Sequence, residues 1–332
     1  MIKSIFLLTD NHKHLHLFDD LISIKNVELK YVEKKHIRNS IVKKIREIHL
    51  SHTINKFISL PLRRLWYTNT KIESIDKKFR YDIFVLDTTL SKIDYKNLNR
   101  IRQDNDNIRL ILILINSLEG KSAGMIEMRD IINKVKWDDI RTFDPVDAKR
   151  NKYTYLGMTY YSKIQISGEV SVKSDAYFVG GLKGDREDNI FNIYKKLRDN
   201  NVNINFDIMI TGFKKLKKKK FENEINYYSN RWLPYEKILE NINNTNCIIE
   251  ILQEGQSGPS LRYFEAVCYN KKLLTNNKHI KEFPFYNEKY MKIFNNENDI
   301  DIEWIKRREE IDYKYNFEFS PRKLISNYIE KE

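Results

Sequence analysis

Short apolar runs alternate with polar stretches of helical spacing in the first half of the chain. Residues 2–9, 81–87 and 110–115 are apolar runs of strand length, and residues 90–105 form a polar helical segment between the last two. Parallel strands that are buried on both faces have this appearance. A strand, a helix and a strand in this order predict a right-handed βαβ unit. A helix over 126–135, a strand over 139–143 and a brief helix after it continue the pattern.

The same alternation returns in the second half. Predicted strands cover 175–180, 205–211, 247–252 and 272–275, and predicted helices cover 188–200, 234–243 and 261–269. This order is typical of a second doubly wound domain, so the fold class is α/β with two Rossmann-like domains. We expect an N-terminal domain over 1–155, a linker over 156–174, a second domain over 175–310 and a tail over 311–332. The last helix of the tail, around 324–329, is expected to return to the N-terminal domain.

The composition favours anionic partners. Against 59 Lys and Arg stand 46 Asp and Glu, a formal net charge of +13. Such a charge suits nucleic acid, an acidic membrane or a phosphorylated substrate. Cys247 and Cys268 form no CxxC pair and have no histidine cluster nearby, which argues against a disulfide scaffold or a zinc site. No apolar run approaches ~18 residues, so we expect a soluble, cytoplasmic protein.

Two glycine-containing segments each follow a predicted strand and precede a helix. In the first, Gly181 lies close to Lys183 and Arg186. Glycine lets the backbone approach a ligand, and free N–H groups at a helix start attract phosphate. The Walker pattern is absent. The alternative is an ordinary turn with solvated charges.

The second segment is a Gly-, Ser- and Gln-rich loop before a helix that starts near Ser260. Ser260 is a plausible N-cap, which leaves the N–H groups of Leu261 and Arg262 to face a diphosphate. Glu265 falls one turn further along, where a carboxylate can accept both hydroxyls of a ribose. The alternative is a capped core helix with a surface glutamate.

These residues resemble the donor-binding stretch of GT-B glycosyltransferases. More narrowly, they resemble a bacterial family linked to capsule, lipopolysaccharide and exopolysaccharide assembly. The resemblance spans roughly residues 80–290, with weaker matches at 112–118 and 142–148. Its main positions are Gln256, Ser257, Gly258, Ser260, Arg262 and Glu265, then Lys271, Lys272, Thr275, Asn277, Phe285 and Tyr286.

The resemblance implies a glycosyltransferase whose two domains face each other across a cleft. A nucleotide-sugar would bind mainly to the C-terminal domain, with Glu265 at the ribose and Arg262 at the diphosphate. Ser260 and Leu261 would join Arg262, and Lys183 or Arg186 would lie opposite. The acceptor would be a surface glycan or a lipid-linked glycan.

The chain departs from the family pattern in two places. Many retaining GT-B enzymes carry a second glutamate eight residues before the ribose ligand, and Ser257 occupies that position. Ile115 stands where the family has an aromatic residue. The role that the first of the two glutamates has in those enzymes is therefore assigned to no residue here, and the stereochemical course is not assigned either.

No metal or other cofactor is expected. Residues 104–106 and 299–301 spell Asp-x-Asp, but neither follows a clear strand. Asp10 and His12 follow the first strand, where a general base could reach an acceptor hydroxyl. The alternative for these two residues is exposure to solvent.

Basic residues also mix with apolar and aromatic ones over 34–71, a pattern typical of an interfacial surface. We therefore expect contact with an anionic membrane at the inner face of the cell membrane; the alternative is a helix packed on its own domain. The lysine run 214–220 is an exposed charge run, a lipid contact or a nucleic-acid contact. Two other functions stay open. One is a basic nucleic-acid-binding protein, which no helix-turn-helix, zinc, RRM or OB pattern supports, and the other is a catalytically inactive GT-B assembly partner.

Overall fold

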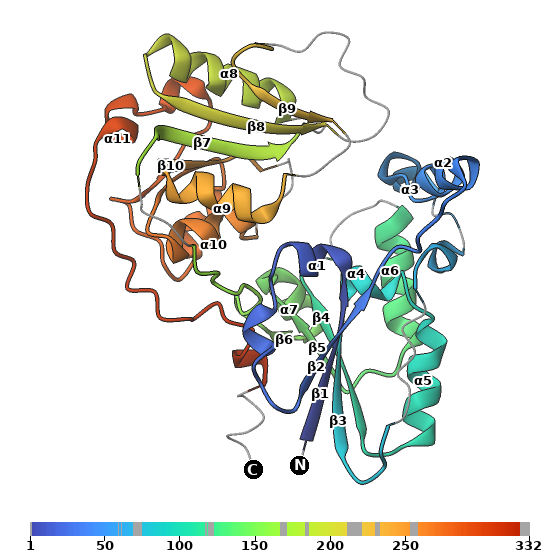
Figure 1. The fold of residues 1–332 in the computed structure, drawn as a ribbon. Helices are drawn as coiled ribbons and strands as arrows, with labels where there is room; N and C mark the ends of the chain where they lie inside the picture. Colours follow the sequence, from blue (N-terminus) through green and yellow to red (C-terminus); the bar gives the residue numbers. More distant parts are fainter. Residues whose placement is uncertain are drawn as a thin grey trace. The chain divides into compact units, whose positions relative to one another are not determined.

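The computed structural model describes residues 2–58, 60, 62–68, 75–116, 118, 123–166, 171–182, 186–210, 221–229, 233–252 and 258–325. The chain divides into two compact units, the first made of 1–162 with 318–332 and the second of 163–317. Within the described residues each unit contains a six-stranded parallel sheet with flanking helices (Figure 1). The predicted α/β class with two doubly wound sheets is confirmed.

The sheet of the first unit has the order β2-β1-β3-β4-β5-β6, so the direction of winding reverses between β1 and β3. The strands are β1 (Ile2–Thr9), β2 (Val27–Val32), β3 (Arg80–Leu86), β4 (Ile108–Leu114), β5 (Asp139–Thr142) and β6 (Thr154–Tyr155). The α-helices are α1 (Asp10–His14), α2 (Ser40–His49), α3 (His52–Phe57), α4 (Asp87–Leu90), α5 (Tyr95–Asp104), α6 (Ala123–Lys134) and α7 (Pro145–Asn151), with short 3-10 turns η1 (Asp19–Leu21) and η2 (Arg63–Trp66).

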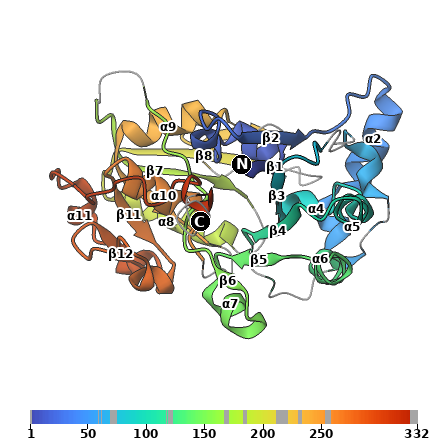
Figure 2. The ribbon, with the colours of Figure 1, turned by 90° about the horizontal axis from the view of Figure 1, so that it is seen from below.

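Helices α5 and α6 lie on the same side of this sheet (Figure 2). Leu98 of α5 and Ile131 of α6 pack in one apolar cluster with alternate residues of the central strands, such as Ile83 and Leu112. On the opposite face the rings of Phe6 and Phe84 stack at 4.3 Å. Both faces of the central strands are therefore buried, which is why these strands are continuous apolar runs in the sequence.

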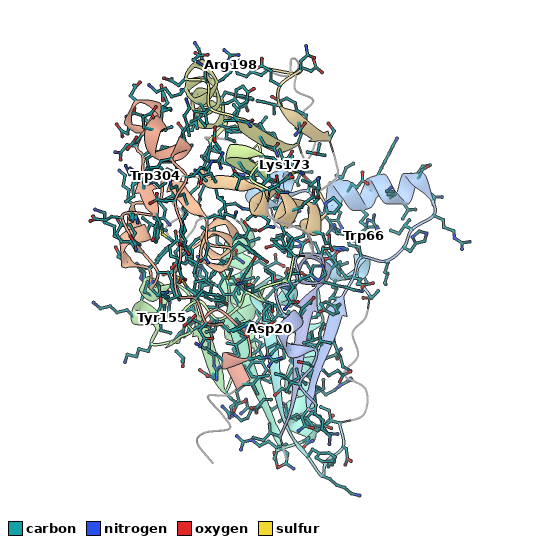
Figure 3. The ribbon with its side chains drawn as sticks, turned by 60° about the vertical axis from the view of Figure 1, so that its left-hand side comes forward. Asp20, Trp66, Tyr155, Lys173, Arg198 and Trp304 are labelled. Carbon is teal, nitrogen blue, oxygen red and sulfur yellow. The ribbon has the colours of Figure 1, made fainter. Side chains whose placement is uncertain are left out.

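The chain returns to the first unit after residue 317. The Tyr161 amide donates to the Phe319 carbonyl at 3.0 Å, and the Ser320 hydroxyl donates to the carboxylate of Asp20 at 2.5 Å. Asp20 is labelled in Figure 3. Most of the helix predicted over 324–329 lies outside the described residues.

The sheet of the second unit has the order β12-β11-β10-β7-β8-β9, and its winding reverses between β7 and β10. The strands are β7 (Ser174–Gly181), β8 (Ile204–Ile210), β9 (Asn226–Ser229), β10 (Thr245–Glu250), β11 (Lys272–Thr275) and β12 (Met291–Ile293). The helices are α8 (Arg186–Asp199), α9 (Tyr235–Asn243), α10 (Leu261–Cys268) and α11 (Ile302–Lys306), with 3-10 turns η3 (Lys278–Glu282) and η4 (Glu297–Asp299). No helix among the described residues of either unit is long and apolar enough to cross a membrane.

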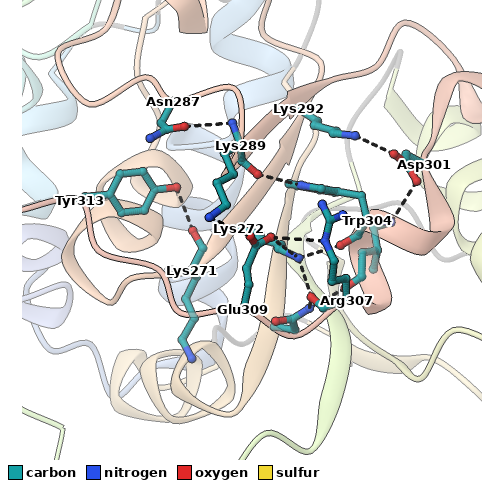
Figure 4. A network of polar contacts seen from close by, with 12 residues as sticks. Lys271, Lys272, Asn287, Lys289, Lys292, Asp301, Trp304, Arg307, Glu309 and Tyr313 are labelled. Carbon is teal, nitrogen blue, oxygen red and sulfur yellow. Dashed lines mark hydrogen bonds and ion pairs between the residues drawn. The ribbon is translucent and has the colours of Figure 1, made fainter.

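A buried lysine fastens the chain after α11 to this sheet (Figure 4). Lys272 of β11 is fully buried, and its Nζ donates to the carbonyls of Trp304 at 2.8 Å and Arg307 at 2.5 Å. Its Nζ also lies 2.9 Å from Oε1 of Glu309. A buried charge is tolerated only when it is paired and hydrogen-bonded. Lys272, one of the positions in the predicted donor-binding stretch, therefore has a structural role.

Candidate functional site

The carboxyl ends of β7 and β10 mark the topological switch point of the second unit, where open α/β sheets bind their ligands. Arg186, the first residue of α8, connects the two strand ends. Its Nε donates to the Gly181 carbonyl at 3.0 Å, and its Nη1 donates to the Ile251 carbonyl at 2.9 Å. The guanidinium thus holds the rim of the predicted donor site together.

Ser260 is the N-cap of α10, as predicted, because its hydroxyl accepts a hydrogen bond from the Arg262 amide at 3.1 Å. The same hydroxyl donates to Glu250, the last residue of β10, and the Thr275 hydroxyl donates to the other oxygen of that carboxyl group. Glu250 is buried, and burial raises its pKa. This carboxyl group therefore joins the start of α10 to the ends of β10 and β11.

Glu265 has no exposed surface. Its Oε1 accepts from the Tyr235 hydroxyl at 3.0 Å, and its Oε2 lies 2.7 Å from Nη1 of Arg262. Burial raises the pKa of Glu265 to about 7, although Arg262 and the Tyr235 hydrogen bond oppose the shift. Glu265 is thus no surface residue, and a ribose that reaches it must replace one of these contacts.

Sequence reasoning missed Glu250, and it also missed another buried carboxylate, Asp207. Asp207 of β8 accepts from the Tyr177 hydroxyl at 2.7 Å and from the Asn241 amide at 3.0 Å. Burial and the neighbouring Asp207 carboxylate raise the pKa of Tyr177 far above its usual value, although the positive charge of Arg262 opposes the shift. The signal in the sequence was an aspartate between the apolar residues Phe206 and Ile208 of strand β8.

The other predicted donor-binding residues divide into two groups. Lys183, Gln256 and Ser257 lie outside the described residues. Gly258 is described, and its carbonyl accepts from Asn277 Nδ2 at 3.4 Å. Leu261 is the first residue of α10, so the structure places it beside Ser260 and Arg262 at the helix start.

Asp10 and His12 lie at the switch point of the first unit, after β1. Nδ1 of buried His12 accepts a hydrogen bond from the Thr9 amide at 3.0 Å, and Nε2 lies 3.2 Å from the Thr88 hydroxyl. Because Nδ1 is an acceptor, the proton of the neutral ring is on Nε2. Burial, with the charge of Lys92, lowers the pKa of His12 to about 3. This geometry gives His12 a structural role in capping α1 and makes it a poor proton acceptor.

Asp87, directly after β3, is a further residue that sequence reasoning left without a role. Its carboxylate accepts from the Thr88 amide at 2.5 Å and from both the amide and the side chain of Asn116 at 3.0 Å. Burial raises the pKa of Asp87 to about 6 against these hydrogen bonds. Asp87 holds the carboxyl ends of β3 and β4 together, next to the edge that carries Asp10.

No group of three or more potential metal-ligating side chains was found among the described residues. Asp299 and Asp301, one of the two Asp-x-Asp pairs, are engaged locally. Asp299 accepts from the amide and side chain of Asn295 at 3.0 Å. Asp301 caps α11 through the Trp304 amide at 2.9 Å and pairs with Lys292 at 2.6 Å.

No family model matches this sequence, and no curated protein matches it. Among solved structures, the chain is similar to an alpha-glucosyltransferase in complex with UDP and a 13-mer DNA containing an HMU base. The identity is 10% and the TM-score 0.53, over 100% of this chain and 99% of that chain. A second alpha-glucosyltransferase complex, with UDP and a 13-mer DNA containing an A:G mismatch, has 10% identity and a TM-score of 0.51 over 91% and 88%. The likeness shows that the chain has the GT-B glycosyltransferase fold.

Proposed function

We propose that this protein is a glycosyltransferase that moves a sugar from a nucleotide-sugar donor to a surface-glycan or lipid-linked acceptor. The observation that carries the proposal is the start of α10. Its capping Ser260 and the Arg262 guanidinium lie at the switch point of a Rossmann-like sheet, where a helix N-terminus and an arginine favour a diphosphate. The UDP complexes of the two similar glucosyltransferases support the same chemistry.

In this proposal the donor diphosphate binds at the Leu261 amide and at the Arg262 side chain, because the Arg262 amide, expected from the sequence to face the ligand, already donates to the Ser260 hydroxyl. Glu265 accepts the ribose hydroxyls once the ligand has displaced the Tyr235 hydroxyl from its carboxylate. Lys183, Gln256 and Ser257, which lie outside the described residues, are proposed as further donor ligands from the sequence alone. Arg186 contributes by keeping the ends of β7 and β10 in place.

Transfer requires that charge on the departing diphosphate be stabilised as the sugar leaves. Preorganised donors aimed at that charge supply much of the rate enhancement in enzymes. Here the helix start and Arg262 carry the charge, and no metal ion is needed. Asp10, half-buried after β1, is the proposed base for the acceptor hydroxyl, because the hydrogen bonds of His12 leave that ring without an available lone pair. The reaction takes place in the cytoplasm, at the inner face of the cell membrane.

A ligand screen by thermal unfolding tests the donor. Nucleoside diphosphates and nucleotide-sugars are compared, beginning with UDP, in buffer with EDTA. A ligand at 100 times its Kd stabilises the protein by about 2.7 kcal/mol. We expect one nucleotide series to raise the melting temperature and the chelator to leave the shift unchanged. If no nucleotide raises it, the proposed donor site is wrong, and if only Mg²⁺ restores the shift, metal independence is wrong.

A further inference from the structure

Helix α2 presents an apolar face to solvent. Its side chains are all at least partly exposed, and those of Ile41, Ile45 and Ile48 are 67%, 52% and 47% exposed. These three residues lie at positions i, i+4 and i+7, so they share one side of the helix. Val42 extends the same side. Single exposed apolar residues are ordinary, but a row of them on one helix face indicates an interaction site.

The helix is capped at its start and attached to the first unit at its end. The Asn39 side chain caps its start by accepting from the amides of Ile41 and Val42. At the other end the Asn55 side chain donates to the His49 carbonyl at 2.9 Å, and the rings of His49 and Trp66 meet edge to face. In Figure 3 the helix with its side chains extends outward near Trp66. The exposed face therefore belongs to a capped and anchored helix.

Exposed basic side chains lie on this helix and in the segment that precedes it. Lys43 and Lys44 are exposed on the helix, and Lys34, Lys35 and Arg38 are exposed in the segment before it. Glu47 is the single acidic residue of α2. The surface formed by these five basic residues with Ile41, Val42, Ile45 and Ile48 is called the α2 surface below.

The chemistry of the α2 surface fits one class of partner best. A nucleic-acid duplex would use the positive charges but would gain nothing from a row of isoleucines, since phosphates dominate that kind of binding. A lipid bilayer uses both features, because apolar side chains enter the boundary between headgroups and acyl chains while lysines contact anionic headgroups. Phe57 and Leu65, which are 76% and 56% exposed, add apolar area along the following segment.

We propose that the α2 surface binds the protein to anionic lipid bilayers, with the isoleucine face inserted in the interface and the lysines among the headgroups. This proposal depends only on the residues of the α2 surface and does not require the proposed sugar transfer. If both hold, the α2 surface brings the catalytic chain to a lipid-linked acceptor.

Vesicle flotation of the full chain tests the proposal, with phosphatidylserine-containing vesicles compared to pure phosphatidylcholine. We expect binding only to the anionic vesicles, with a steep decline as salt rises. Lys43→Ser/Lys44→Ser should weaken binding about 30-fold, and Ile41→Ser/Ile45→Ser/Ile48→Ser at least tenfold.

The matched controls remove the same kinds of side chain elsewhere in the first unit. Lys77→Ser/Lys78→Ser deletes an exposed lysine pair before β3, and Ile22→Ser deletes an isoleucine that is 65% exposed. Both should bind vesicles as the native chain does. Urea unfolding of every variant identifies any that is destabilised, and since the substituted positions are exposed, changes should stay within about 0.5 kcal/mol.

Three results would overturn the proposal. Equal binding to neutral and anionic vesicles would remove the role of charge, and equal losses in the variants and their controls would remove the role of the α2 surface. Duplex DNA binding that falls in the lysine variant, without vesicle binding by the native chain, would assign the surface to nucleic acid. Nucleotide-induced stabilisation, measured on the same variants, reports separately on the donor site.

Discussion

Nη1 of Arg262 lies 2.7 Å from Oε2 of Glu265, and the glutamate has no exposed surface. The two residues are one turn apart on α10, so they meet on the same side of the helix. The arginine balances a carboxylate that burial would otherwise protonate. A diphosphate at Arg262 would compete with Glu265 for the same guanidinium. The pair therefore couples ligand binding to the protonation state of Glu265.

Arg262→Ala and Glu265→Gln should affect different parts of the donor. Arg262→Ala removes a charge-assisted contact to the diphosphate, so the affinity for both a nucleoside diphosphate and inorganic pyrophosphate should fall about ten- to a hundredfold. Glu265→Gln should lower the affinity for the nucleoside diphosphate on the same scale and leave the affinity for pyrophosphate nearly unchanged. Calorimetry measures both ligands. Equal losses for both ligands in Glu265→Gln would show that Glu265 only positions Arg262.

The buried Glu265 should make stability depend on pH. Its pKa is about 7 in the folded protein against 4.5 in the unfolded chain, so the folded state binds the proton more tightly between these values. This contribution to stability is complete below pH 4.5 and is lost as the pH rises through 7, on the order of 3 kcal/mol. Urea unfolding of native chain and Glu265→Gln from pH 4 to 8 should show a smaller decline in the variant. Parallel curves would contradict the shifted pKa.

Arg186→Ala should destabilise the second unit even without ligand. The substitution removes the hydrogen bonds to the carbonyls of Gly181 and Ile251, and we expect the free energy of unfolding to fall by about 2–3 kcal/mol. Lys195→Ala, an exposed control on the same helix α8, should change it by less than about 0.5 kcal/mol. An Arg186 variant of native stability that has lost nucleotide binding would make Arg186 a donor ligand.

Asp10→Asn and His12→Gln should separate catalysis from structure. If Asp10 is the base, Asp10→Asn should reduce kcat for sugar transfer by about 10²–10⁴-fold while the nucleotide Kd stays the same. His12→Gln keeps a hydrogen-bonding side chain near Thr9 and Thr88, so we expect reduced stability and a smaller effect on kcat. A kcat loss in His12→Gln as large as in Asp10→Asn, at unchanged stability, would reverse the assignment.

The sequence was sufficient to predict the central strands of both sheets. β1, β3, β4, β7, β8, β10 and β11 are all interior strands, and each was recognised as a short apolar run. The strands that sequence analysis did not identify, β2, β6, β9 and β12, are the outermost strands of the two sheets. An edge strand is short and half-solvated, so it need not be apolar on both faces, and only its pairing in the folded chain defines it.

The candidate site likewise contains features that the local sequence determines and features that only the fold determines. Local sequence determined Ser260 as the N-cap of α10 and therefore the position of the helix start, because capping depends on residues close together in the chain. The carboxyl groups of the candidate site each also have a partner from a distant segment: Tyr235 of α9 for Glu265, Thr275 of β11 for Glu250, and Tyr177 of β7 for Asp207. Whether a carboxylate is exposed, paired or buried depends on such long-range packing. Only the tertiary structure could place Glu265 out of solvent and change the pKa at which it titrates.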